Sequence, residues 1–461
     1  MPLPSARRAA IAAAADLRRR RRLDERPMRG LTGRDAALAH ELRMGLARRW
    51  LTLRAVLSAF LAEPWDRLDG RVADVLAVGA YQIIWLTRVP DYVAVNEAVE
   101  HAKRAVSRRA AGLVNAVLRA VLRSLTGDLV PLAGADPSRC VPVDVSRGRR
   151  FDVPVLPDPA TDRLGWLSAA TSHPRERVER WARQFGAARA ESICAADQTQ
   201  PPIFLRPDPR RHTTSSLCDA LRAEGVDATV AADGFSVCLP AEANPHELSV
   251  VQSAGAQPQD PTSIAVGRLT AARPGERVLD LCAGVGTKTF QMVEMMDDAG
   301  VVLAADRDGG RLDALRRRAG RTGCTSVRVV DAGAVPAAVG GLTGPLDLIL
   351  IDAPCSNSGV FARRPEARYR LDRPSLERLV GVQSGLLGQA ADLATPTTRV
   401  VYSTCSIEPA ENEHVIEGFL QSHPRWRADP PMAVCPAVPP RPAAWRDGGF
   451  ATTLRRIDAT D

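Results

Sequence analysis

The sequence contains no long apolar run, and no stretch reaches the roughly 18 residues that a membrane-spanning helix needs. The basic residues near the N-terminus are not followed by an apolar core and a small-residue cleavage site, so we expect no secretory signal. The sequence therefore predicts neither a membrane protein nor a secreted one. Hydrophobic residues still make up 45% of the chain, enough to form large cores, which argues against disorder.

Paired cysteine motifs are also missing. The nine cysteines are scattered along the chain and none of them forms a Cys-x-x-Cys pair. An odd number without that spacing indicates reduced thiols rather than a disulfide framework or a zinc site. We therefore expect a cytoplasmic protein that holds no metal.

Lysine is nearly absent: of the 61 basic residues only Lys103 and Lys288 are lysines. A composition bias of the genome explains most of the arginine. Arginine also binds phosphate well, because its guanidinium makes bidentate hydrogen bonds. A net charge of +8 therefore permits a nucleic-acid partner without proving one.

A chain of 461 residues predicts two or three domains. Apolar residues at helical spacing in residues 1–125 predict an all-α domain. Residues 126–165, which are rich in Pro, Gly and Asp, are expected to be a linker. Mixed patterns in residues 166–250 predict a small α+β module.

Residues 251–461 alternate β-rich apolar runs with helical patterns. This alternation predicts a doubly wound, mostly parallel, Rossmann-like sheet with helices on both faces. The five expected strands are Arg277–Cys282, Val301–Asp306, Val327–Asp331, Leu346–Asp352 and Arg399–Thr404.

The first of these strands runs into a glycine-containing turn that indicates a cofactor site. Glycines there allow a ligand to approach the backbone, and Asp306 at the end of the next strand is placed to bind the ribose hydroxyls of an adenosine. The dinucleotide fingerprint lacks its third glycine and the phosphate-loop pattern is absent, which disfavours NAD and ATP. S-adenosylmethionine (SAM) carries no phosphate and fits better. The turn comprises Cys282, Ala283, Gly284, Val285, Gly286, Thr287 and Lys288.

Two cysteines follow the ends of two strands, Cys355 after the fourth and Cys405 after the fifth. If the first, fourth and fifth strands are neighbours, both thiols face the cofactor. A thiolate that adds to carbon-6 of cytosine makes carbon-5 nucleophilic toward the methyl group of SAM, and a second thiol removes the carbon-5 proton or assists release. Asp352 is expected to hydrogen-bond the base near N3. A single cysteine is more often a small buried apolar residue than a nucleophile. The hypothesis of nucleophilic catalysis therefore rests on the presence of two cysteines at strand ends.

These motifs resemble the bacterial 16S rRNA cytosine-5 methyltransferases of the Sun type. The resemblance rests on Asp280-Leu281-Cys282-Ala283, Asp352-Ala353-Pro354-Cys355-Ser356, Tyr402-Ser403-Thr404-Cys405-Ser406, Glu411-Asn412-Glu413 and Asp447-Gly448-Gly449-Phe450. It implies that Cys405 is the nucleophile and that Cys355 aids its release. It also implies a SAM site that includes Asp306, Arg311, Asp331 and Asp352, and a monomer that acts on RNA.

The resemblance extends to the rest of the chain. Segments such as Val95-Asn96-Glu97-Ala98-Val99 look like a NusB-type helical domain, which implies RNA binding, and Ser172-His173-Pro174 and Leu205-Arg206-Pro207 resemble an RNA-facing module. The chain departs from the family in its cofactor turn, where Gly284-Val285-Gly286-Thr287 replaces the usual Ala-Pro-Gly-Gly. It also has Asp331-Ala332 where a Gly-Asp is usual.

Two alternatives remain open from the sequence. In the first, the enzyme domain has lost its activity and the chain is a non-catalytic NusB-like RNA-binding or ribosome-assembly protein. The altered cofactor turn slightly favours this alternative. In the second, the chain is an NAD-dependent oxidoreductase and the turn holds a dinucleotide. Retention of both cysteines with Asp306 and Asp352 favours the methyltransferase.

Overall fold

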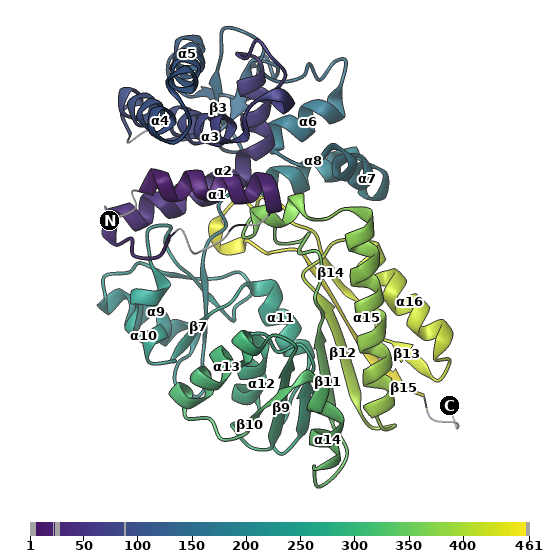
Figure 1. The fold of residues 1–461 in the computed structure, drawn as a ribbon. Helices are drawn as coiled ribbons and strands as arrows, with labels where there is room; N and C mark the ends of the chain where they lie inside the picture. Colours follow the sequence, from purple (N-terminus) through teal and green to yellow (C-terminus); the bar gives the residue numbers. More distant parts are fainter. Residues whose placement is uncertain (1–5, 22, 24–27, 87–88, 458–461) are drawn as a thin grey trace. The chain divides into compact units, whose positions relative to one another are not determined.

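The computed structural model describes residues 6–21, 23, 28–86 and 89–457 (Figure 1). The chain divides into two compact units. Residues 1–200 and 361–370 form the first, and residues 201–360 and 371–461 form the second. The domain limits expected from the sequence remain predictions.

The first unit begins with helices, as the sequence predicts, and α3 is their centre. Thirteen of the sixteen residues of α3 are buried, because the other helices pack around it. Its first turn is capped by Asp69, whose side chain accepts from the Arg71 amide, and Arg18 forms an ion pair at 2.9 Å with the buried Asp74. These helices are α1 (Ala6–Arg20), α2 (Gly33–Ser58), α3 (Gly70–Trp85), α4 (Asp91–Ala105) and α5 (Arg108–Ser124).

The segment expected to be a linker contains a small antiparallel sheet in the order β1-β3-β2. Its strands are two to four residues long, too short for an alternating pattern to be visible in the sequence. They are β1 (Val130–Pro131), β2 (Cys140–Pro142) and β3 (Arg147–Arg150). Three helices complete the unit: α6 (Arg163–Thr171), α7 (Arg175–Phe185) and α8 (Ala187–Ala196).

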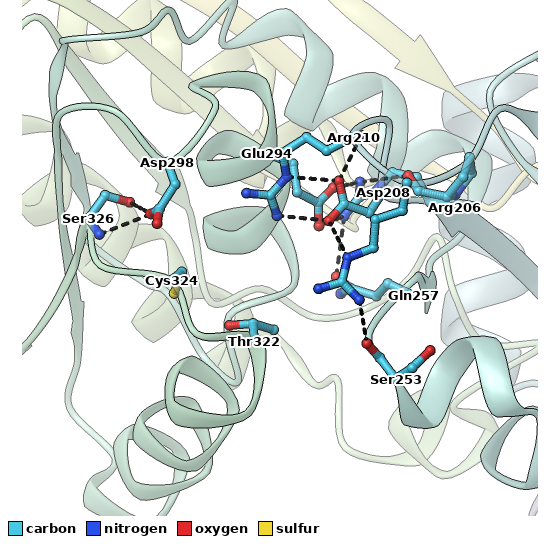
Figure 2. A network of polar contacts seen from close by, with 12 residues as sticks. Arg206, Asp208, Arg210, Ser253, Gln257, Glu294, Asp298, Thr322, Cys324 and Ser326 are labelled. Atoms are coloured by element: carbon cyan, nitrogen blue, oxygen red, sulfur yellow. Dashed lines mark hydrogen bonds and ion pairs between the residues drawn. The ribbon is translucent and has the colours of Figure 1, made fainter.

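The second unit begins with a four-stranded antiparallel sheet in the order β5-β6-β4-β7. This sheet supplies the β-strands of the small α+β module that the sequence predicts. The elements of this module are β4 (Phe204–Pro207), α9 (Thr214–Ala223), β5 (Thr229–Val230), β6 (Val237–Cys238), α10 (Ser249–Gln252) and β7 (Ala256–Pro258). Its buried Arg206 binds Glu294 of the following sheet domain through both terminal nitrogens of its guanidinium, which joins module and domain (Figure 2).

The main sheet has the order β10-β9-β8-β11-β12-β15-β13, and β14 also pairs with β15. The five expected strands are present and parallel, which confirms the predicted fold class. The strands are β8 (Arg277–Asp280), β9 (Val301–Asp306), β10 (Val327–Asp331), β11 (Leu348–Asp352), β12 (Arg399–Thr404), β13 (Trp426–Ala428), β14 (Met432–Val434) and β15 (Gly449–Arg456). The last three are antiparallel additions that the sequence did not predict.

Both faces of this sheet are covered, because neighbouring residues of each strand point to opposite sides. In β8, Val278 packs with α12 on one face, whereas Leu279 packs with α15 and α16 on the other. The helices of this domain are α11 (Pro261–Leu269), α12 (Thr287–Met295), α13 (Gly309–Thr322), α14 (Val335–Gly340), α15 (Arg373–Leu393) and α16 (Glu413–Ser422).

Candidate active site

The site lies where the order of strands changes direction, at the carboxyl ends of β8, β11 and β12. From the sequence, the two cysteines were expected to face the cofactor only if these three strands are neighbours. The structure confirms this arrangement, with β11 between β8 and β12. Asp352 at the end of β11 is in register with Ser403 of β12. Residues that follow the two strands therefore emerge side by side, in the crevice where open α/β sheets bind ligands.

The sulfur atoms of Cys355 and Cys405 lie 3.2 Å apart. Contact with Cys405, together with burial, raises the pKa of Cys355 well above its ordinary value, so Cys355 is a neutral thiol at pH 7. The Cys405 thiol also donates to the side-chain oxygen of Asn357 at 3.3 Å. Asn357 has a φ of 61°, a left-handed conformation that asparagine adopts more readily than most residues.

One buried carboxylate, that of Glu411, holds both cysteine loops. It accepts from the amide and hydroxyl of Ser356, which follows Cys355, and from the hydroxyl of Ser406, which follows Cys405. The side-chain amide of Gln383 donates to the same carboxylate at 3.1 Å. Burial raises the pKa of Glu411 despite these hydrogen bonds. This shared anchor fixes the positions of the two thiols relative to each other.

Asn412 secures the loop of Cys405 a second time. Its side-chain oxygen accepts from the Thr404 hydroxyl at 2.6 Å, and its amide donates to the Ser406 carbonyl at 3.0 Å. Sequence reasoning noticed Glu411-Asn412 only as part of a motif and gave neither residue a role. Both residues are buried, which only the structure reveals, and buried polar groups require partners.

Lys288 and Asp352 form an ion pair beside the thiols, with 2.7 Å between Nζ and Oδ2. Burial lowers the pKa of Lys288, but the charge of Asp352, its hydrogen bond and the nearby Cys405 and Asp280 together outweigh this effect, so the net pKa is raised and the ammonium remains charged. The other oxygen of Asp352 accepts from the Ser403 hydroxyl at 2.9 Å. The ammonium is also close enough to Cys405 for their charges to interact.

The expected cofactor turn follows β8, and its two glycines adopt the conformations that such turns need. Gly284 and Gly286 have φ values of 58° and 87°, in the region that side chains rarely adopt. A side chain at Gly284 would meet no atom within 4 Å, so the space beside this backbone is open. Cys282 and Ala283 enter the turn, Val285 is exposed at its tip, and Thr287 begins α12.

Asp306 lies at the end of β9, where the sequence placed it. One carboxylate oxygen accepts from the Gly284 amide at 2.9 Å and the other from the Asp308 amide at 2.8 Å. Each oxygen keeps a second lone pair for a ligand hydroxyl. Asp331 ends β10 directly opposite Asp306 in the register, and Arg311 lies at the rim, 3.8 Å from Asp306.

Asp280 is a further acidic residue beneath the turn, to which sequence reasoning assigned no role. Burial raises its pKa to about 7, although the Thr289 hydroxyl donates to it at 2.7 Å. Its other oxygen has no partner among the described residues. Asp280, Asp306 and Asp352 together make the surroundings of the turn acidic.

The remaining seven cysteines are free thiols of differing exposure. Cys140, Cys194, Cys218 and Cys238 are buried, and Cys282, Cys324 and Cys435 are partly exposed. Burial beside the acidic residues raises the pKa of Cys282. Among the residues that the structure describes, no helix is long and apolar enough to cross a membrane, and no three potential ligand side chains cluster as a metal site.

Three family models match the chain. One described as 16S rRNA methyltransferase RsmB/F matches residues 268–436, one for the NusB family matches residues 4–123, and one for a ferredoxin-like domain of RsmF/B-like methyltransferases matches residues 173–240. Ribosomal RNA small subunit methyltransferase B of Thermus thermophilus is 31% identical over 438 residues, which cover 92% of this chain and 90% of that protein.

Two solved structures have the same fold. The crystal structure of PH0851 superposes with a TM-score of 0.73 at 20% identity and covers 99% of both chains. The structure of NSun6 from Pyrococcus horikoshii with SFG, a SAM analogue, superposes with a TM-score of 0.51 at 16% identity and covers 62% of this chain and 98% of that one. At 20% and 16% identity, these two similarities show the fold alone.

Proposed function

The chain belongs to the family of 16S rRNA methyltransferases RsmB/F, and we propose that it transfers a methyl group to carbon-5 of a cytosine in 16S rRNA. The single observation that carries the cytosine-5 chemistry is the pair of thiols, 3.2 Å apart, at the ends of two adjacent strands. Carbon-5 of cytosine is a weak nucleophile, and a thiol that adds to carbon-6 removes this difficulty.

In the proposed reaction the Cys405 thiol first loses its proton to water, and its sulfur bonds to carbon-6 of the cytosine. The charged ammonium of Lys288 lies close enough to stabilise this thiolate. Negative charge that develops on the ring at N3 is met by the Lys288–Asp352 pair, whose two residues span the end of β11 and the start of α12. Carbon-5 then carries the electron pair that forms the new carbon–carbon bond.

The raised pKa of Cys355 suits it to the second half of the reaction. As a neutral thiol it donates its proton to the sulfur of Cys405 while the bond from carbon-6 to that sulfur breaks. In the same step Cys355 receives the proton that leaves carbon-5. The cysteines and the base are then restored, and the proton that Cys405 gave to water is the net product of the exchange.

SAM supplies an electrophilic methyl group on a positively charged sulfur. The residues around the turn fit such a ligand, because Asp280, Asp306 and Asp352 surround a glycine turn with open space. Asp306 can accept from ribose hydroxyls, and the turn lacks the third glycine that the pyrophosphate of NAD needs. We propose that Asp306 binds the ribose hydroxyls, that the backbone from Cys282 to Lys288 cradles the methionine part, and that Asp331 and Arg311 border the adenine.

The RNA substrate follows from the family and from the N-terminal NusB match. The target cytosine has to be unstacked, because a thiol and a methyl donor must both reach its ring. We propose that the first unit contributes RNA affinity and that the chain acts as a monomer. The mechanism needs both thiols reduced, which is consistent with action in the cytoplasm.

Transfer of labelled methyl groups to small-subunit rRNA, followed by nucleoside analysis, tests this function. We expect 5-methylcytidine with the native chain and none with Cys405→Ala, which should still bind SAM in calorimetry. Cys435→Ala, which removes another partly exposed thiol, is the matched control and should remain active. If the native chain binds RNA but transfers no methyl group to free or partly assembled rRNA, the non-catalytic alternative is correct.

A further inference from the structure

A separate cleft of about 240 Å³ lies within the second unit, away from the thiols. One wall belongs to the module of β4 to β7 and the other to α12 and α13 (Figure 2). The charged residues that line it are Asp208, Arg210, Arg211, Glu294, Arg318 and Arg321. We call this feature the arginine cleft.

The arginine cleft has more positive than negative charge, and its carboxylates are already occupied. Glu294 is held by Arg206 behind the wall, and Asp208 accepts from Arg210 at 2.7 and 3.0 Å (Figure 2). Within the described part of the chain, neither Arg318 nor Arg321 has a carboxylate within 4.0 Å. Two guanidinium groups therefore line the cleft without an ion-pair partner within 4.0 Å in the described residues, although the charge of Glu294 still acts on Arg318.

Arg318 is the more confined of the two. Its guanidinium lies 4.4 Å from the centre of the Phe290 ring and donates to the Gln257 side chain. Burial lowers its pKa to about 10; the charge of Glu294 opposes this shift, and the like charges of Arg206 and Arg321 add to it. Arg318 still carries its charge at pH 7, in a setting where a bound anion would relieve the repulsion.

The arginine cleft lies beside the cofactor turn rather than beside the thiols, because its lining residue Phe290 lies against Gly286 and its Gln257 side chain donates to the Thr287 carbonyl at 3.5 Å. Arg318 and Arg321 belong to the last turns of α13, which leads into the first residue of β10, whereas Cys355 and Cys405 follow carboxyl ends of strands. A ligand that reaches both the arginines and the thiols has to extend past the cofactor turn, as a polymer can.

We propose that the arginine cleft binds backbone phosphates of the substrate RNA, outside the site that holds the target cytosine. Guanidinium groups bind phosphate oxygens through paired hydrogen bonds, and arginines on both walls match a chain of phosphates better than one small anion. The inference rests on RNA being the substrate, as proposed above. It adds an anchoring surface that positions RNA without taking part in the chemistry.

Arg321→Glu tests this surface, because Arg321 is exposed and its replacement should not disturb folding. Arg317→Glu is the matched control: it is an exposed arginine of the same helix that lies outside the cleft and changes the net charge equally. In fluorescence anisotropy with a long rRNA fragment, Arg321→Glu should weaken binding about tenfold or more, the size expected for losing one charged hydrogen bond. It should also reduce the salt dependence of binding by about one phosphate contact. Arg317→Glu should have little effect on either quantity.

The length of the RNA separates this proposal from the proposed function. A short oligonucleotide that contains only the target and its nearest neighbours should be methylated equally by the native chain and by Arg321→Glu, whereas a long fragment should be methylated more slowly by the variant at limiting RNA. If both variants bind and methylate the long RNA like the native chain, the arginine cleft is not an RNA site, and the methyltransferase proposal stands. If inorganic phosphate binds in an Arg321-dependent manner but long RNA binding does not depend on Arg321, the site takes small anions and the proposal is wrong.

Discussion

Glu411→Gln tests whether one carboxylate positions both reactive thiols. The substitution keeps the size of the side chain and removes its charge. The amide oxygen can keep the hydrogen bonds from the Ser356 amide and Gln383, which both reach Oε1. The new NH₂ group then faces the hydroxyls of Ser356 and Ser406, which both donate to Oε2 in the native chain.

The cost follows from those two contacts. A hydrogen bond to a charged group contributes roughly 1.5–3 kcal/mol, and each serine hydroxyl can turn to accept from the amide, so part of this is regained. We expect the free energy of unfolding to fall by about 3 kcal/mol. Because the serines directly follow Cys355 and Cys405, a shift of about 1 Å in either loop should slow methyl transfer roughly 100-fold.

Single-turnover methyl transfer and urea unfolding measure the two effects. Glu417→Gln is the matched control, because Glu417 is an exposed residue of α16 and its variant should behave like the native chain. A Glu411→Gln chain that transfers methyl groups at the native rate would show that the shared anchor does not determine the positions of the thiols. SAM affinity should be unchanged, because Glu411 does not border the cofactor turn.

Three other substitutions give separate tests. Asp280→Asn should reduce the loss of folding stability with rising pH. Because the folded pKa of Asp280 is raised to about 7, the native chain loses up to about 4 kcal/mol as pH rises from 4 through 7. If urea unfolding shows the same change of unfolding free energy with pH in both chains, this prediction is wrong. Lys288→Met should slow methyl transfer at least about tenfold, because it leaves Asp352 without its ion pair. Lys103→Met, which replaces the other lysine, is the control and should transfer methyl groups at the native rate. Equal rates for the two variants would exclude a role of Lys288 in the reaction. Asp306→Ala should weaken SAM binding in calorimetry about tenfold or more, since it removes ribose contacts and the acceptor for the Gly284 amide; unchanged affinity would exclude Asp306 from the site.

Sequence patterns were sufficient for the parallel strands but not for their additions. Strands such as Val301–Asp306 are nearly continuous apolar runs, because both faces of a parallel sheet are buried. β15 is different: it is rich in threonine and arginine and lies next to an antiparallel partner, so its sequence has no apolar run to detect. Short strands such as β1 owe their existence to their pairing partners and not to any local pattern.

The part of the site that lies at strand ends could be predicted from the sequence. Cys355, Cys405, Asp352 and Asp306 are each tied to a strand end, so a parallel sheet places them at one edge. The role of Glu411 was not predictable, because its value lies in four donors that come from three separate segments of the chain. Contacts between distant segments leave no periodic trace in the sequence.

The most direct measurement of the central claim is to trap the bond between protein and RNA. The Cys355→Ala chain, incubated with SAM and substrate rRNA, should accumulate a complex that survives denaturation, because release of Cys405 is slowed. After nuclease and protease digestion, mass spectrometry should place a nucleotide on the peptide that contains Cys405, and Cys405→Ala should give no such complex. A stable adduct that forms with Cys405→Ala and maps to Cys355 would contradict the account.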